Sequence, residues 1–301
     1  MTGPTPAGRL LRRACPAALG IAALAALAGF AGGRPVEADT AAVRVKSLYV
    51  AARPDAGPPP VPTSPATAEA VLFDEGTRHV YARFAYEQAA DQEIRVVVKG
   101  RGGVTVFGHG ARYSGDGTAT IDIDGTAVYG VLAGALSADA RDAKQSAKQA
   151  AERSVGVQEY LRSAEAAVLR LVWTAELLGN VDLPPAPAAE VAEIDGSLRD
   201  AILILARAIE LPPDDIAGKQ RRAAQVDTML GEVVRASTDL SAQAAQLRDL
   251  PLPSTGHHAT DTFVVQVEVA GDIAVTAEFW VWGPARIQLP VLSKGAFLRS
   301  R

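Results

Sequence analysis

Residues 262–282 read TFVVQVEVAGDIAVTAEFWVW, in which apolar and polar side chains alternate on both sides of a tight turn at Gly271-Asp272. Such alternation predicts two antiparallel β-strands that share one apolar face. A two-stranded hairpin is only marginally stable in water, so this one requires a larger sheet to join. A long helical pattern precedes it, and other strand-like sequence lies only before that pattern. We therefore expect the hairpin to complete a sheet that begins ahead of the helices.

The N-terminal residues 1–38 have the pattern of a secretory signal peptide. Arginines at positions 9, 12 and 13 precede an apolar run over residues 17–31, and a small-residue cleavage site ends at Ala38. We expect export of the chain, with cleavage after Ala38. The apolar run of about 15 residues is shorter than a membrane span, but its retention as an uncleaved anchor is the alternative.

Charge and cysteine content narrow the classes of partner. The single cysteine, Cys15, lies in the signal segment, so a cleaved chain holds no internal disulfide and depends on hydrophobic burial. Cleavage removes four arginines and one glutamate, which moves the formal charge from −4 to −7. This acidic balance argues against a nucleic-acid partner. Membrane contact is expected only through an uncleaved signal segment.

Strand patterns separated by turn glycines fill residues 39–135, apart from a proline-rich loop at 53–68. The segments are VYARFAY (80–86), then EIRVVVK (93–99) and VTVF (104–107) around a glycine turn, then the turn YSGDG (113–117). With the closing hairpin they resemble the immunoglobulin-like β-sandwich modules of bacterial surface and secreted proteins. The resemblance implies an antiparallel sandwich, formed discontinuously by residues 39–135 and 251–301, and it brings no catalytic residues.

Heptad-like spacing of small and apolar residues fills residues 136–250. We expect one helix from about 136 to 178 with Ser137 as its N-cap, a second over 188–211, and a third that follows Pro212-Pro213. The first helix, about 44 residues, is roughly 65 Å long, so it suits either a coiled-coil-like hairpin with a two-part return limb or a three-helix bundle. The predicted fold class is α+β, an antiparallel immunoglobulin-like sandwich interrupted by a helical insertion.

Residues with catalytic or metal-binding chemistry are few. The histidines at 79, 109, 257 and 258 lack the spacing of metal ligands, and we expect them in surface loops. The aspartates at 116, 122 and 124 lack the calcium-loop pattern, and Asp116 suits a turn. No serine lies in a nucleophile elbow. We therefore expect no enzyme activity, no metal and no cofactor.

The final strand carries the candidate contact residues. Alternation places Glu278, Trp280 and Trp282 on the face opposite its apolar residues. Two indoles on an exposed face can stack on a sugar or anchor a protein partner. The alternative is that the helices or the tail RIQLPVL (286–292) cover this face, because large aromatic side chains more often pack than stand exposed.

Three functions follow from these observations. The first is a non-enzymatic secreted or cell-envelope protein that makes protein or cell-surface contacts through its sandwich and helical arm. The second is an extracytoplasmic protein that binds a small ligand or a glycan. The third is an enzyme whose site leaves no sequence motif. The sequence indicates no oligomeric state.

Overall fold

The computed structural model describes residues 43–57, 71–255 and 262–283. The predicted signal peptide, most of the proline-rich loop, His257, His258 and the tail 286–292 lie outside these residues. The fold is α+β, as predicted. Its strands are β1 (Arg44–Ala51), β2 (Val71–Phe73), β3 (His79–Lys99), β4 (Thr105–Asp124), β5 (Phe263–Val269) and β6 (Asp272–Val281). Its helices are α1 (Gly125–Glu152), α2 (Val157–Gly179), α3 (Pro185–Ile209) and α4 (Ile216–Ala244), with a short 3-10 turn, η1 (Arg101–Gly103).

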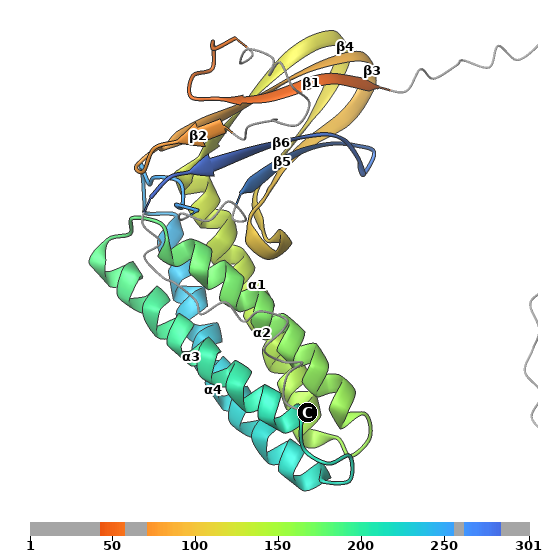
Figure 1. The fold of residues 1–301 in the computed structure, drawn as a ribbon, viewed down its shortest axis with the longest axis vertical. Coiled ribbons are helices and arrows are strands. Elements are labelled where there is room, and N and C mark those ends of the chain that lie inside the picture. Colours follow the sequence, from red (N-terminus) through yellow and green to blue (C-terminus); the bar gives the residue numbers. More distant parts are fainter. Residues whose placement is uncertain (1–42, 58–70, 256–261, 284–301) are drawn as a thin grey trace, which may run out of the picture. The chain divides into compact units, whose positions relative to one another are not determined.

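The six strands form one mixed sheet in the order β1-β3-β5-β6-β2, with β4 on the other edge of β3 (Figure 1). Because β3 has 21 residues, β1 pairs with its first half and β5 with its second half, while β4 runs along both. All pairs are antiparallel except β2 with β6. The closing hairpin thus joins strands that precede the helices, as predicted for residues 262–282.

The expected antiparallel sandwich of two sheets is not what these strands form. β1 also approaches β6, so the single sheet curls until it is nearly a barrel (Figure 1). The physical reason lies in β3, whose register against β4 shifts between Tyr86 and Ala89 and again between Ala90 and Gln92. Extra residues of this kind bend a strand, and here they turn it around the core instead of dividing the sheet. The alternation of apolar and polar residues is the same in a two-sheet sandwich and in a single curled sheet, so it does not distinguish them.

The helices form a four-helix bundle, which corrects the expected two-limbed hairpin or three-helix arrangement. α1 packs on α2 and α4, and α3 packs on the same two helices. The single helix expected over 136–178 is broken between Arg153 and Gly156, where Gly156 has a φ of 75° and is the N-cap of α2. Ser154, which the heptad-like spacing places on the apolar side of that expected helix, is exposed in this connection. The spacing of apolar residues continues unchanged across this short connection, so the spacing alone does not reveal the break.

The first helix also begins earlier than predicted. It starts at Gly125, directly after β4, and Asp124 caps it by accepting a 2.8 Å hydrogen bond from the Ala127 amide. Ser137, the predicted N-cap, is instead buried inside α1. The helical elements therefore span residues 125–244, and the assignment of a discontinuous domain stays a prediction.

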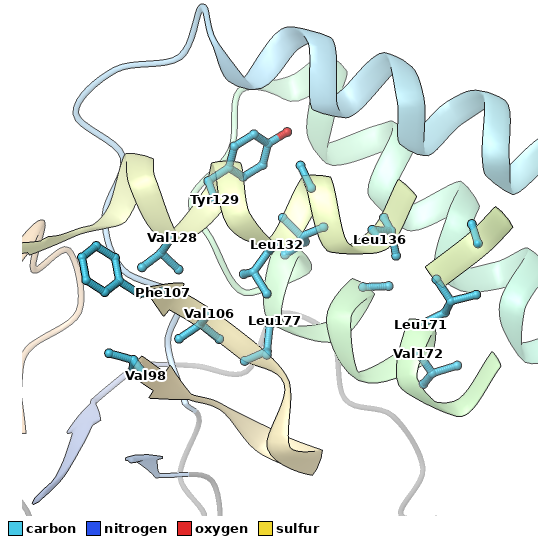
Figure 2. Packing of buried hydrophobic residues seen from close by; sticks show 14 of the residues in the cluster. Val98, Val106, Phe107, Val128, Tyr129, Leu132, Leu136, Leu171, Val172 and Leu177 are labelled. Atoms are coloured by element: carbon cyan, nitrogen blue, oxygen red, sulfur yellow. The ribbon is translucent and has the colours of Figure 1, made fainter. Parts of the chain in front are cut away.

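The interior of the sheet and the bundle share one hydrophobic core. Figure 2 shows Val98 and Val106 of the sheet facing Val128 and Leu132 of α1, with Leu177 of α2 beside them. In the closing hairpin, Phe263, Val265 and Val267 of β5 are buried, as are Phe279 and Val281 of β6. The turn end of the hairpin extends beyond the core, because Ile273 is 55% exposed although its spacing predicted the apolar face.

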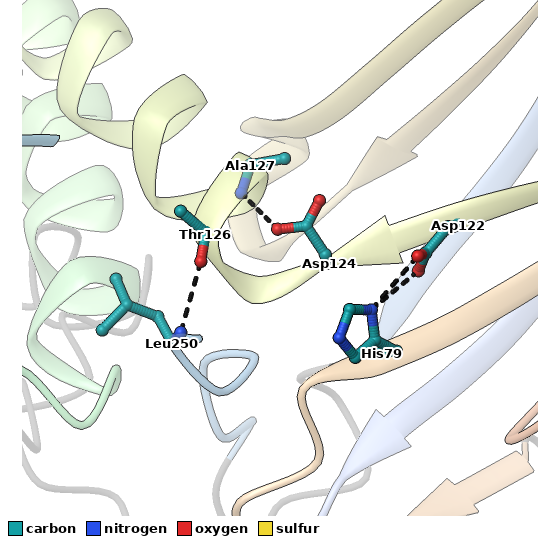
Figure 3. A network of polar contacts seen from close by, with 6 residues as sticks. All are labelled: His79, Asp122, Asp124, Thr126, Ala127 and Leu250. Atoms are coloured by element: carbon teal, nitrogen blue, oxygen red, sulfur yellow. Dashed lines mark hydrogen bonds and ion pairs between the residues drawn. The ribbon is translucent and has the colours of Figure 1, made fainter. Parts of the chain in front are cut away.

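The chain leaves the sheet and returns to it at one point. A Cβ atom on Gly125 would overlap the carbonyl oxygen of Leu250 and lie 2.5 Å from the carbonyl carbon of Pro251. The Leu250 amide donates a 3.2 Å hydrogen bond to Thr126 Oγ1 (Figure 3). Two residues later, the Leu252 amide donates to the Thr77 carbonyl at 2.8 Å. Only glycine permits this approach of the two backbones.

Replacement of Gly125 by alanine tests this contact. We expect the free energy of unfolding to fall by about 1 to 3 kcal/mol, because the added methyl group meets backbone atoms that have no room to move. Gly130→Ala is the matched control, since a Cβ there meets nothing within 4 Å. In the same helix it should raise stability by about 0.5 to 1 kcal/mol. Urea unfolding followed by circular dichroism measures both, and equal effects would contradict the close approach.

Candidate functional site

The predicted contact residues lie on β6 but differ in exposure. Glu278 is exposed, Trp280 is half-buried and Trp282 is 48% exposed. Trp280 Nε1 is buried and has no hydrogen-bond partner among the described residues. Leu72 of β2 lies opposite Trp280 in register and is 55% exposed. The two indoles therefore do not form one flat exposed platform, and the exposed apolar surface here consists of Leu72 and Trp282.

The turn η1 attaches the sheet to α2. Arg101 Nη1 lies 2.9 Å from Glu176 Oε1, and the backbone of Gly102 lies against the ring of Trp173. The cavity beside this contact has a volume of about 20 Å³. It is lined by Arg101, Glu176, Leu177, Asn180, Ser254, Thr255 and Phe263. A space of this size holds about one water molecule, so the contact is structural and not a ligand site.

The glycines of η1 provide a matched pair for testing this attachment. Gly102 and Gly103 both have positive φ, of 66° and 76°, but an added Cβ would overlap Trp173 only at position 102. Both alanine variants should lose about 1 kcal/mol to backbone strain. Gly102→Ala should lose a further 1 to 3 kcal/mol through steric overlap and should change the Trp173 fluorescence. Equal unfolding midpoints in urea would show that the turn does not dock on α2.

Wider depressions lie elsewhere on the described structure. One, of about 500 Å³, lies at the connection between α1 and α2, around Ser154 and Tyr160. A second, of about 190 Å³ between α3 and α4, is lined mainly by charged side chains: Glu190, Glu193, Glu232, Arg235 and Asp239. A third, of about 240 Å³, lies beside the return segment and includes Glu75, Asp182 and Ser254. In the described ranges, histidine, cysteine and carboxylate side chains form no group that could hold a metal ion. None of these depressions combines an apolar wall with converging polar groups, as ligand sites usually do.

Tyr129 is a fully buried polar residue at the sheet end of α1. Its hydroxyl has no hydrogen-bond partner in the described structure. Burial, together with the negative charge of Glu190, raises the pKa of Tyr129 to about 12. The folded protein therefore binds this proton more tightly than the unfolded chain, in which the pKa is about 10.

This raised pKa predicts a loss of stability at alkaline pH. The contribution of neutral Tyr129 is present below pH 10 and is lost as the pH rises from about 10 to 12. Tyr129→Phe should leave stability at pH 7 within about 1 kcal/mol of the parent, because the buried hydroxyl has no described partner. It should also flatten the loss above pH 10. Tyr160→Phe, which removes an exposed hydroxyl bonded to Arg153, is the control and should keep the parent's pH profile in thermal unfolding.

The other polar residues singled out in the sequence have structural roles. His79 Nδ1 lies 3.1 Å from both carboxylate oxygens of Asp122, on the exposed side of β3 and β4 (Figure 3). Asp116 accepts a 2.8 Å hydrogen bond from the Gln88 amide beside the bend of β3. His109, predicted in a surface loop, is exposed but lies within β4. These side chains do not converge on one site.

β4 is a continuous strand, contrary to prediction. The glycines of GHGARYSGDG predict turns, but residues 105–124 form one strand of 20 residues. β3 pairs with it throughout, and no other strand in the described ranges pairs with it. Along its centre, Gly108, His109, Gly110, Arg112 and Ser114 are exposed. We call this free side of residues 105–124 the β4 edge.

Comparisons of the chain with protein-family models, curated proteins and solved structures found no match. Of the four α-helices in the described part of the chain, none has a long enough apolar stretch to cross a membrane. The β4 edge is a feature of the described residues that no internal strand pairing uses.

Proposed function

We propose that this chain is an exported, non-enzymatic protein that acts through protein contacts, and that the β4 edge is its contact surface. The observation that carries the proposal is the length of β4, whose 20 residues pair on one side only within the described structure. The free side of such a strand presents a row of backbone donors and acceptors, which can accept an added strand from a partner.

The composition of β4 supports this use. Proteins usually protect edge strands by keeping them short or by placing lysine or proline on them. The edge strand β2 has three residues, and the edge strand β1 carries Lys46. β4 has neither protection, because its sequence TVFGHGARYSGDGTATIDID contains no lysine and no proline. A long edge that carries neither of these two devices can accept a partner strand.

Export and the cell envelope are part of the same proposal. They rest on the charged, apolar and small-residue order of residues 1–38, which suits a signal peptide cleaved after Ala38. An enzyme without a sequence motif gains no support from the described residues.

A second candidate function is the binding of a glycan or another flat ligand. The exposure of Trp282, 48%, and of the neighbouring Leu72 favours it, because an exposed indole beside an aliphatic side chain can stack on a sugar ring. The half-buried Trp280 reduces the platform to one indole. We therefore place this function second.

Photo-crosslinking in cells that make the protein tests the contact surface. A photoreactive phenylalanine analogue placed at His109, on the β4 edge, should give adducts of defined mass. The same analogue at Leu203 of α3, which is 52% exposed, is the control and should give none. The expected adducts form because strand addition places a partner within reach of residue 109.

Fractionation of the same cells tests export, since the adduct and a chain with an intact mass beginning at Asp39 should both lie outside the cytoplasm. Absence of adducts from position 109, or equal adducts from both positions, would refute the β4 edge as the contact surface. A cytoplasmic chain that keeps residues 1–38 would refute export.

A further inference from the structure

We infer that the partner of the β4 edge is β4 of a second copy of this chain, paired antiparallel about a two-fold axis at Ser114. The inference rests on the proposed function and names its partner. A two-fold axis is the commonest symmetry of protein dimers, and it requires a surface that is complementary to itself. The side chains of β4 meet this requirement in one register.

The charges of β4 select that register. With the axis at Ser114, Arg112 of each copy lies opposite Asp116 of the other. An axis at Arg112 or at Asp116 would instead place like charges directly opposite each other, which destabilises a strand pair. Arg112 and Asp116 are both exposed, and they are the only charged residues between Thr105 and Ile121.

The Arg112 guanidinium and the Asp116 carboxylate each make a contact within the chain, and each can still bind a second group. Arg112 Nη1 lies 3.0 Å from Asp91 Oδ2, and Asp116 Oδ1 accepts from the Gln88 amide. A guanidinium has five N–H donors and a carboxylate has two oxygens, so each group retains capacity for a partner across the axis. The Arg112 side chain is 72% exposed, so a second carboxylate can reach it.

Side-chain size fits the same register. The glycines at 108 and 110 lie opposite Thr120 and Thr118 of the second copy. The ring side chains of His109 and Tyr113 lie opposite Ala119 and Gly115. Every bulky residue at these positions thus faces a small one. The register shifts near the bend add residues to β3 and none to β4, although Gly115, next to the axis, has a φ of 70° and is not extended.

Pairing with a second copy would explain why position 108 is glycine. Its φ is not positive, and a Cβ there would meet nothing within 4 Å, so the described packing does not require glycine. Glycine inside a strand weakens it and often marks a close approach of another backbone. The strand of a second copy is such a backbone.

A cysteine at the axis tests the register directly. In full-length protein with Cys15→Ser, the variant Ser114→Cys should form a disulfide-linked dimer under mild oxidation. Residues opposite each other in an antiparallel pair have Cα atoms about 4.5 to 5.5 Å apart, which is within disulfide range. Ser154→Cys, exposed in the connection between α1 and α2, is the matched control and should stay mostly monomeric. Equal dimer yields from the two variants would overturn the inference.

Charge reversal tests the pairing without a covalent bond. Arg112→Asp and Asp116→Arg should each weaken the dimer about tenfold in sedimentation velocity, because the axis creates two like-charge pairs. The double variant should restore the dimer. Circular dichroism controls for folding, and the loss of contacts to Asp91 or Gln88 would not be reversed by combining the changes.

Failure of this inference is distinct from failure of the proposed function. If the protein stays monomeric at about 100 times the concentration at which it is made, the self-pairing is overturned. Adducts from His109 to a different protein would overturn it as well, yet they would support the β4 edge as a contact surface. Absence of both dimer and adducts would overturn both proposals.

Discussion

The close approach of two backbones at Gly125 is the constraint on which the arrangement of sheet and bundle depends. The chain leaves the sheet there and returns past the same atoms at Leu250 and Pro251. A helical insertion can be added to a sheet without disturbing its pairing only if its two ends lie together. The 124-residue separation between the hydrogen-bonded partners Thr126 and Leu250 shows how much chain this one contact closes. Closing a loop of that length is entropically unfavourable, so other contacts have to offset it.

The docking of η1 on α2 is one such contact. Gly102 against Trp173, and Arg101 beside Glu176, attach the tip of the β3–β4 hairpin to the bundle at a second place. One attachment leaves two bodies free to rotate about it, whereas two restrict that rotation. The core supports this rigidity, because Val106 and Leu177 lie in the same buried cluster as the interior of the sheet. The ordered junction in turn fixes the direction of β3 and β4, and therefore the side on which the β4 edge lies.

Local sequence patterns predicted the positions of individual strands and helices. Alternation around Gly271 located the β5–β6 hairpin, and apolar spacing located the helical residues. The break at Gly156 was missed because Ala150 and Val157, on its two sides, keep the apolar spacing of a continuous helix while the chain reverses. Curling of the sheet was missed for a related reason. Strand partners and bends in β3 depend on residues far apart in the chain, and alternation is the same in a sandwich and a barrel.

The glycines in residues 105–124 made β4 difficult to predict from the sequence. Glycine has low β-propensity, so Gly108, Gly110, Gly115 and Gly117 together favour turns when they are considered alone. β4 is a strand because β3 pairs with it along its whole length, and this nonlocal pairing outweighs the local preference. Three of these glycines have internal reasons: a Cβ at position 117 would meet the Tyr86 ring, one at position 110 would lie 2.8 Å from Glu93 Oε1, and Gly115 has a φ of 70°. Position 108 has none of these reasons. The strand of a second copy, proposed above, is a contact that would use this glycine, and the proposal depends on the pairing of β4, which local sequence patterns do not reveal.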